Sequence, residues 1–588
     1  QQIIQSDPNQ PDALHLLGVI AHQLGKNDTA VDLITKALTI RPDFAKAHNN
    51  LGLALQGQGK LDEALTSYKK ALAIMPDFSK AHYNLGGVLD ELGKLDEAVA
   101  SYRNAISVDP DFAEAHFFLG KALKQRDELS EAMASYHQAL SINPDFAEAH
   151  NNLGNVLKHM GVLDKALACY RQALLIKPDF VDAHSNLLAC LNYEIEVMQA
   201  DIMGEAREWD RRHASAFTGT SNHDNDRSPD RRIRIGYVSP DMRRHSVSYF
   251  FEPLLAAHDS SVVETFCYAD VAAPDATTRC LEGHADHWRM TIGMDDQTLA
   301  DTIRADGIDI LVDLAGHTAK NRLLVFARRP SPVQVTWLGY PNTTGLTAMD
   351  YRLVDAVTDP VDEASETLLR LPNGFLCYRP ADEAPPHVPS RSPGPLTFGS
   401  FNKANKMSKS CIKLWARILT EVPESRLLLK SGQFADATTQ ELVRTKFAVH
   451  GIAPERLDLR PHTESLESHL GLYAEVNVCL DPFPYNGTTT TCEALWMGVP
   501  VVTLRGEHHR DRVGTSILSR VGLDECVAVD ADTYVSIAVG LARDTARQIE
   551  LRSEMRERMA PLCDAGSFAR DMEAAFRSMW RDWCVASS

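Results

Sequence analysis

The first third of the chain carries apolar residues at a spacing that returns unit after unit. Within residues 94–108, apolar side chains stand at Leu95, Ala98, Tyr102 and Ala105, which places them on one face of a helix. Proline recurs every 34 residues along the same stretch, at Pro8, Pro42, Pro76, Pro110, Pro144 and Pro178. A fixed period in this range indicates a stack of equal units, since one unit cannot bury its apolar stripe alone. Each unit is predicted to hold two helices, as at 76–92 and 94–108, and the array to span residues 1–191.

The length of the period identifies the kind of repeat. A period of 34 residues is typical of the tetratricopeptide helix–turn–helix unit. The later prolines are followed by Asp-Phe and then Ala-His, as in residues 42–44 and 47–48. Such stacks form a curved surface that holds other polypeptides. Proteins or peptides are therefore the expected partners of this superhelix.

Two polar rows run through the repeats. Asparagine occupies one position on the first helix of four units, at Asn50, Asn84, Asn152 and Asn186, and Leu16 and Phe118 interrupt the row. These amides could pair with the backbone of an extended peptide or bond a neighbouring repeat, and the spacing does not decide between the two. Histidine also recurs, at His48, His82, His116, His150 and His184. We predict that the histidines pack between repeats, because units ~10 Å apart cannot chelate one ion at bond lengths of ~2 Å.

Beyond the repeats the pattern changes to strands that alternate with helices. Residues 192–230 are predicted to be a linker, helical to about residue 216 and polar afterwards. Strands are predicted at 234–239, 308–314 and 333–339, within a first α/β domain at 231–380. A proline-rich joint at 381–395 leads to a second α/β domain at 396–588, which ends in helices. Its strands are predicted at 396–401, 426–429, 457–460, 476–480 and 499–504. Two such domains place a ligand at the carboxyl ends of their strands.

Composition narrows the class of protein. The 588 residues are 44% hydrophobic and 24% charged, as in globular proteins, and the formal net charge of −19 argues against a nucleic-acid partner. No apolar run is long enough to cross a bilayer. The 11 cysteines are scattered without a Cys-x-x-Cys pair, which favours buried thiols in a reducing, cytoplasmic setting. The start, Gln1 to Ile4, resembles neither a signal peptide nor a natural N-terminus, so residues are expected upstream.

The most suggestive chemistry lies in residues 481–496. A buried strand ends there, Gly487 permits a tight approach, and Thr488, Thr489 and Thr490 stand at the start of a helix. Free N–H groups and the helix dipole form an anion site at such a point, and Glu493 could accept hydrogen bonds from ribose. Plain N-capping by threonine is the alternative. No Gly-x-Gly-x-x-Gly or Walker loop is present, so a dinucleotide oxidoreductase or NTPase is poorly supported.

Four further residues follow predicted strands and are candidates for catalysis. Lys406 would suit a diphosphate leaving group, although a solitary loop lysine is usually only solvated. His245 follows the first strand, and Asp313 with His317 flanks another, so these could move a proton off a hydroxyl nucleophile. A satisfied loop histidine and an acid that caps the next helix are the alternatives. The Asp-x-Asp pairs at 224–226, in the linker, and at 530–532, near the tail, do not follow a sheet strand into the cleft, so neither a metal nor another cofactor is expected.

At these residues the chain resembles the nucleocytoplasmic O-GlcNAc transferase family, particularly its bacterial homologues. The shared segments are 234–241 with His245, 337–341, 401–402 with Lys406, 478–481, and 486–487 with the threonine run. The resemblance covers nearly the whole chain and implies a two-lobed GT-B glycosyltransferase. It implies inverting transfer of N-acetylglucosamine from UDP-GlcNAc to Ser or Thr hydroxyls of a peptide presented by the repeats.

The resemblance also implies roles for single residues. Thr489 and Thr490 match a diphosphate-binding pair, Glu493 an acidic residue at the ribose, and His469 a histidine at the uridine. Lys406 matches the lysine that neutralises the leaving diphosphate. His245, Asp313 and His317 match candidates for the base.

Departures from the family pattern leave two alternatives open. Animal members have an aromatic residue where Asn405 stands and a lysine where Leu466 stands, and they insert a long domain where this chain has a short joint. One alternative is a related protein O-fucosyltransferase that uses GDP-fucose. The other is a repeat scaffold that binds a nucleotide sugar with little turnover. Self-association stays open as well.

Overall fold

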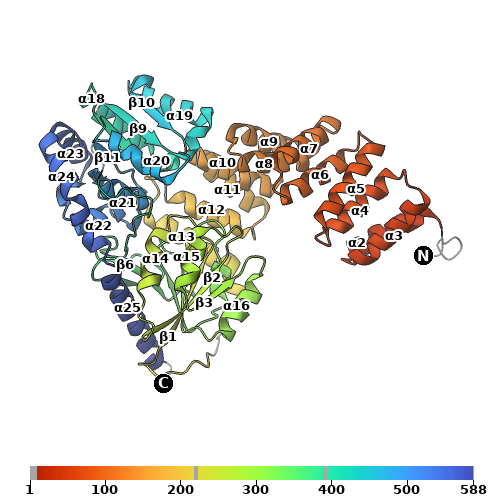
Figure 1. Cartoon of the computed structure of the whole chain (residues 1–588), viewed down its shortest axis with the longest axis horizontal. Coiled ribbons are helices and arrows are strands. Elements are labelled where there is room, and N and C mark those ends of the chain that lie inside the picture. The colour runs from red at the N-terminus through yellow and green to blue at the C-terminus, as the bar shows by residue number, and fades with distance from the viewer. Residues whose placement is uncertain (1–8, 218–222, 389–390, 393, 587–588) are drawn as a thin grey trace. The chain divides into compact units, whose positions relative to one another are not determined.

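The structure is a computed structural model that describes residues 9–217, 223–388, 391–392 and 394–586. Pro8, residues 218–222 of the predicted linker, residues 389–390 and 393 of the predicted joint, and the last two residues lie outside this description. Contacts divide the chain into two compact units, Gln1–Leu157 and Lys158–Ser588. Each is described by itself, with the element labels of Figure 1.

The first unit consists of paired helices, as the 34-residue period predicts. They are α2 (Pro11–Gln23), α3 (Asn27–Ile40), α4 (Ala45–Gln56), α5 (Leu61–Ile74), α6 (Ser79–Glu91), α7 (Leu95–Val108), α8 (Ala113–Gln125), α9 (Leu129–Ile142) and the start of α10 (Ala147–His159). In α4, α6 and α8 a glycine meets a tyrosine of the following helix, whereas Gly18 of α2 meets Ile34. A Cβ on Gly52 would lie 2.6 Å from the Tyr68 ring, and one on Gly86 would lie 2.7 Å from Tyr102. These contacts explain why glycine and tyrosine keep the same period.

The recurring histidines are packing residues, as predicted. Each of four imidazoles hydrogen-bonds through Nε2 to the carbonyl of the proline six residues earlier, at 2.9–3.0 Å. These residues are His48, His82, His116 and His150. The bond ties each first helix to the turn before it, so the histidine and proline periods have one cause. His184 instead contacts Glu205 and His213, at 2.7 and 2.9 Å.

The second unit begins with the end of the helical array and joins it to a sheet. Its first helices are α11 (Leu163–Ile176), α12 (Val181–Leu191) and α13 (Gln199–Trp209), followed by the π-helical turn η1 (Asp210–Ala214) and the 3-10 turn η2 (Ser215–Phe217). Buried amides fix these helices to the first sheet domain. Asn192 Nδ2 donates to the Tyr340 hydroxyl at 2.9 Å, and Gln199 Nε2 donates to Asn342 Oδ1 at 2.7 Å.

The first sheet has seven strands in the order β3-β2-β1-β4-β5-β6-β7, and every neighbouring pair is parallel. The strands are β1 (Ile233–Ser239), β2 (Val263–Ala269), β3 (His287–Met290), β4 (Ile310–Asp313), β5 (Val333–Thr336), β6 (Tyr351–Asp355) and β7 (Thr367–Leu371). The helices are α14 (Ser248–Ala257), α15 (Ala276–His284), α16 (Asp296–Ala305) and α17 (Leu323–Ala327). The three predicted strands are β1, β4 and β5.

The second sheet has six parallel strands in the order β10-β9-β8-β11-β12-β13. They are β8 (Thr397–Ser400), β9 (Arg426–Lys430), β10 (Leu457–Arg460), β11 (Val478–Leu480), β12 (Val501–Leu504) and β13 (Val527–Ala528). The helices are α18 (Lys409–Glu421), α19 (Ala437–Ala448), α20 (Leu466–Gly471), α21 (Thr489–Trp496), α22 (Val513–Arg520), α23 (Ala531–Arg543) and α24 (Thr545–Arg558). Short 3-10 turns are η3 (Ala404–Lys406), η4 (Gly432–Ala435), η5 (Pro454–Arg456), η6 (Leu472–Glu475), η7 (His509–Asp511), η8 (Asp524–Cys526) and η9 (Ala560–Leu562). The prediction of repeats followed by two parallel α/β domains is confirmed.

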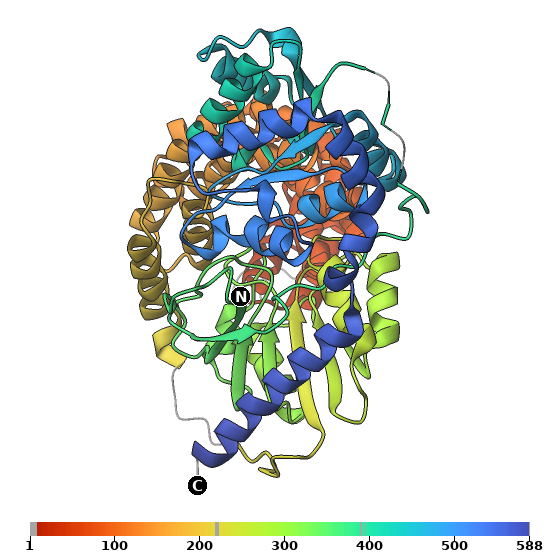
Figure 2. The ribbon, with the colours of Figure 1, turned by 90° about the vertical axis from the view of Figure 1, so that its left-hand side faces the viewer.

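The last helix, α25 (Ala565–Ala586), returns to the first sheet. It packs against α14, β5 and β7, and Figure 2 shows it in dark blue across the green and yellow strands. His258 Nδ1 and Glu573 Oε1, 2.9 Å apart, join the end of α14 to this helix. Phe576, Met579 and Trp580 are fully buried in an apolar cluster that contains residues of both sheets. The chain therefore leaves the second sheet domain and ends on the first.

The structure bears on two expectations from composition, one for the cysteines and one for membrane-spanning helices. None of the 11 cysteines, all of which are described, forms a disulfide. In the described part of the chain, no helix is both long and apolar enough to cross a membrane.

Candidate active site

Three neighbouring strands of the second sheet end in polar segments. Strands β9, β8 and β11 lie side by side and run parallel, so their carboxyl ends share one edge. Lys430 ends β9, residues 401–406 follow β8, and Asp481 follows β11. Ligands of parallel α/β sheets bind at this edge.

Lys406, which is half-buried, and the buried Asp481 carry opposite charges at this edge and influence each other's titration. Lys406 Nζ donates to the Asn486 carbonyl at 2.7 Å and lies 4.3 Å from the centre of the Tyr485 ring. Burial lowers the pKa of Lys406 to about 7, although the nearby Asp481 carboxylate opposes this shift. Burial likewise raises the pKa of Asp481 to about 7, while Gly487 N–H donates to its carboxylate at 2.7 Å. A phosphate placed beside Lys406 would favour the charged amine that burial disfavours.

Helix α21 begins at the same edge with an uncapped first turn. Within the described chain, the side chain of its N-cap residue, Thr488, makes no capping hydrogen bond. Thr490 Oγ1 instead donates to Asn402 Oδ1 at 3.0 Å, and Thr491 Oγ1 donates to the Gly487 carbonyl at 3.0 Å. A Cβ on Gly487 would lie 2.6 Å from the Thr490 hydroxyl, so glycine is required for this close approach. Thr488 therefore does not cap α21, and the N–H groups of the first turn lie at the sheet edge.

A chain of three polar side chains lies next to this helix start. Lys430 Nζ is 2.6 Å from His469 Nδ1, and His469 Nε2 is 3.0 Å from Glu493 Oε2. Because an ammonium group only donates, Nδ1 accepts and Nε2 carries the proton that is donated to Glu493. The Tyr473 hydroxyl donates to Glu493 as well, at 3.4 Å. This places His469 and Glu493, both predicted site residues, in direct contact.

Lys430, one of these three polar side chains, was not predicted as a site residue from the sequence. It is 6% exposed, and burial lowers its pKa, against the charge of Glu493. A single lysine at the end of a strand carries no motif. The available signal was its position: Lys430 ends the strand beside β8, at the same edge as Lys406 and Asp481.

The first sheet domain faces this site through the segment that follows β1. His245 lies there, with Nδ1 3.5 Å from Asp241 Oδ2. Burial lowers the pKa of His245, and the charge of Lys403 in the second domain lowers it further. The charge of Glu493 also contributes to the raised pKa of Tyr249, after burial. Residues 245 and 249 therefore lie close to the edge described above.

Asp313 has a structural position, so its predicted catalytic role does not fit the geometry. It is 1% exposed, and burial raises the pKa of its carboxyl group to about 6. Its carboxylate accepts hydrogen bonds from the N–H groups of Ala315 and Gly316, at 3.0 and 2.8 Å, and from the Thr336 hydroxyl, at 2.8 Å. These contacts hold the turn after β4 and do not cap the next helix, α17, whose N-cap residue is Arg322.

His317 is likewise enclosed, and a role as base does not fit its surroundings. It is 1% exposed, Nε2 donates to the Thr344 carbonyl at 2.7 Å, and the ring packs edge-on against Trp209 and Tyr340. Burial lowers the pKa of His317 to about 3. Its partner Trp209 belongs to α13, so His317 fastens α13 to the first sheet.

The asparagines of the first unit border a hollow. A cavity of about 470 Å³ is lined by Asn50, Asn84, Lys80, Tyr83, Phe112 and Glu114, among others. Asn50 Nδ2 lies 2.8 Å from His15 Nε2, and Asn84 Nδ2 donates to Asn49 Oδ1 at 2.9 Å. In the second unit, Asn186 Oδ1 accepts from Lys158 at 3.3 Å. Asn50 and Asn84 therefore contact a neighbouring repeat and also line the hollow. Asn152 Oδ1 accepts a hydrogen bond from Asn151 Nδ2 at 3.5 Å.

The two departures from the family pattern have neighbours that supply the missing groups. Asn405 is buried and lies near Tyr193, while Tyr485 places an aromatic ring beside Lys406. Leu466 packs against the apolar core, while Lys430 places a cation on His469.

Comparison with known proteins agrees with this geometry. The profile of glycosyl transferase family 41 matches residues 212–380 and 390–572. Tetratricopeptide profiles match segments between residues 20 and 180. The solved structure of a Thermobaculum terrenum O-GlcNAc transferase mutant aligns with a TM-score of 0.76 and 35% identity, covering 92% of this chain and 98% of that one. The two parallel sheet domains that follow the repeats are the two lobes of a GT-B fold.

Curated relatives are similar over part of their length. The probable UDP-N-acetylglucosamine–peptide N-acetylglucosaminyltransferase SPINDLY of Solanum lycopersicum is 43% identical over 408 residues, 68% of this chain and 44% of the relative. The SEC protein of Arabidopsis thaliana, with the same descriptive name, is 32% identical over 60% of this chain and 38% of its own length. This chain thus spans less than half the length of these relatives. The profile match, the fold and the edge residues together show that the chain belongs to glycosyl transferase family 41.

Proposed function

We propose that this chain transfers N-acetylglucosamine from UDP-GlcNAc to Ser or Thr hydroxyls of polypeptides held by its repeats. The observation that carries the proposal is Lys406, a half-buried amine beside the uncapped start of α21, at the edge where α/β sheets bind ligands. A diphosphate leaving group suits this combination of a cation and free helix N–H groups. The names of the relatives support the donor and the acceptor class.

The proposed reaction is a single displacement. The acceptor oxygen forms a bond to the anomeric carbon while the bond from that carbon to the diphosphate oxygen breaks, and its electron pair leaves with UDP. Attack opposite to the leaving group inverts the configuration. Lys406 and the N–H groups of α21 oppose the charge that develops on the diphosphate, so no metal is needed in this proposal.

The remaining residues bind and position. We assign the nucleoside to Glu493 and His469, because Lys430 fixes the tautomer in which Nε2 of His469 donates. His245, beside Asp241 and facing Lys403, is the proposed acceptor of the hydroxyl proton. Its lowered pKa keeps the imidazole neutral near pH 7, as a base requires. Asn50 and Asn84 are proposed to bind the acceptor backbone in their hollow.

Mass spectrometry of a peptide pool incubated with the chain, EDTA and either UDP-GlcNAc or GDP-fucose tests this function. We expect added N-acetylhexosamine on Ser or Thr with the first donor and no deoxyhexose with the second. Deoxyhexose transfer alone would reassign the donor. Tight UDP binding without any transfer would indicate a scaffold and contradict the proposal.

A further inference from the structure

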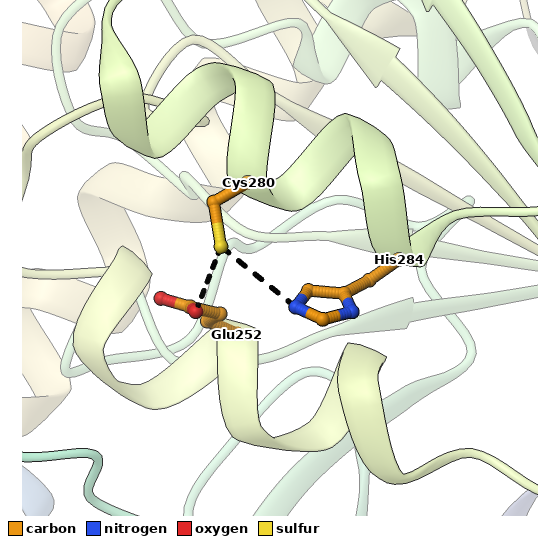
Figure 3. Close-up of side chains that lie close together, drawn as sticks. All are labelled: Glu252, Cys280 and His284. Carbon is orange, nitrogen blue, oxygen red and sulfur yellow. Dashed lines mark hydrogen bonds between the residues drawn. The ribbon is translucent and has the colours of Figure 1, made fainter.

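Three side chains with metal-binding atoms converge between two helices of the first sheet domain. Cys280 and His284 lie four residues apart on α15, and Glu252 lies on α14. Figure 3 shows the three pointing toward one another across the gap between these helices. Their ligand atoms all lie within 4.8 Å of one another, and among the described residues this is the one such group of His, Cys, Asp and Glu. None of these three residues belongs to the candidate active site around Lys406 and Glu493.

The distances fit a tetrahedral ion. Cys280 Sγ is 3.2 Å from Glu252 Oε1 and 3.8 Å from His284 Nε2. Bonds of about 2.3 Å to sulfur and about 2.0–2.2 Å to nitrogen and oxygen place tetrahedral ligand atoms roughly 3.3–3.6 Å apart. Two ligands four residues apart on one helix face, with a third from another element, are a common zinc arrangement. The thiol, imidazole and carboxylate need only small movements to meet one ion.

We propose that Glu252, Cys280 and His284 bind a zinc-class divalent cation. A thiolate, an imidazole and a carboxylate favour Zn²⁺ over Mg²⁺ or Ca²⁺, which prefer oxygen ligands. Binding forms bonds from the three protein atoms to the ion and releases the thiol proton to solvent. Water would complete the fourth position.

A resident cation competes for one of the three ligands. The guanidinium of Arg379 forms an ion pair with Glu252 Oε1, and its Nη2 also donates to Asp382 at 2.9 Å. The Arg379 backbone N–H donates to the Tyr249 carbonyl at 2.8 Å. Glu252 Oε1 cannot bind the metal ion and pair fully with Arg379 at the same time. The metal ion is therefore expected to displace the Arg379 guanidinium toward Asp382. Removing the arginine charge should therefore strengthen metal binding.

Metal binding at this place would also brace the segment that carries His245. Arg244 N–H donates to Asp275 Oδ2 at 2.8 Å, and Asp275 caps the start of α15. The segment then leads directly into α14. An ion that joins α14 to α15 therefore fixes both helices that border residues 241–247.

Titration of the full chain with Co²⁺, followed by displacement with Zn²⁺, tests the site without reference to catalysis. We expect one thiolate-to-cobalt absorption band per chain, which Zn²⁺ removes. Cys280→Ser should abolish the band, and His284→Ala should weaken binding at least about tenfold. Arg379→Gln should tighten binding about tenfold. Cys584→Ser, a partly exposed thiol on α25, is the matched control and should leave the band unchanged.

Failure of the expected cobalt pattern would contradict the proposal. No stoichiometric band in the wild-type chain, or a band that persists in Cys280→Ser, overturns the proposal. Circular dichroism of each variant separates loss of the site from loss of fold. In a folded His284→Ala chain, unchanged affinity would also contradict the assigned ligand set.

Discussion

Lys406 shows how one residue combines burial, charge and position. Its amine is held by the Asn486 carbonyl and the Tyr485 ring, and burial lowers its pKa to about 7. The sequence predicts this residue because it follows a strand and matches a motif. Lys430 matches no motif and was missed, although it completes the contact to His469. Asp313 and His317 also follow a strand, but sequence position does not reveal that their polar atoms are occupied.

The titration of Lys406 predicts a pH dependence for UDP binding. Above about pH 7 the free amine loses its proton, and binding of the diphosphate must restore it, so affinity should fall as pH rises, by at most about tenfold per pH unit. Calorimetry between pH 6 and pH 9 in buffers of different ionisation enthalpy would detect the proton uptake. Lys406→Met should bind more weakly and lose this dependence. Lys409→Met should keep the pH dependence, because the side chain of Lys409 is 86% exposed.

The helices of the first unit show why an element repeats. Glycine at Gly52 and Gly86 admits the rings of Tyr68 and Tyr102, and each histidine closes on the proline carbonyl before it. Period and helix bounds were therefore predictable from the sequence. The asparagine row was ambiguous because the same amides contact neighbouring side chains and line a hollow.

Two adjacent glycines of α6 provide a matched test of this packing. Gly86→Ala should destabilise the repeats by about 1–3 kcal/mol, because its Cβ would lie 2.7 Å from the Tyr102 ring. In Gly87→Ala the nearest atom, the Tyr102 hydroxyl oxygen, is 4.0 Å away, so the change should be neutral or stabilising by about 0.5–1 kcal/mol. Urea unfolding of the full chain, followed by circular dichroism, measures both. Equal effects of the two changes would contradict the packing argument.

At the scale of the whole molecule, the order of repeats, first sheet and second sheet was readable from the chain. Strands β1, β4, β5, β8, β9, β11 and β12 are largely buried and stand out as apolar runs, whereas β2, β3, β6, β7 and β13 were not predicted. The return of α25 to the first sheet could not be foreseen either, since a helical pattern identifies a buried face and not its partner. The proximity of His245 to Lys403 likewise depends on tertiary structure, which a sequence pattern does not show.

The central claim is that the edge around Lys406 transfers a sugar to polypeptide. Single-turnover transfer from UDP-GlcNAc to an acceptor peptide, measured for wild type, Lys406→Met and Lys409→Met, tests it most directly. We predict transfer by wild type and by Lys409→Met, and a loss of at least about 100-fold in Lys406→Met, because the leaving diphosphate loses its cation. Equal rates for all three chains would contradict the account.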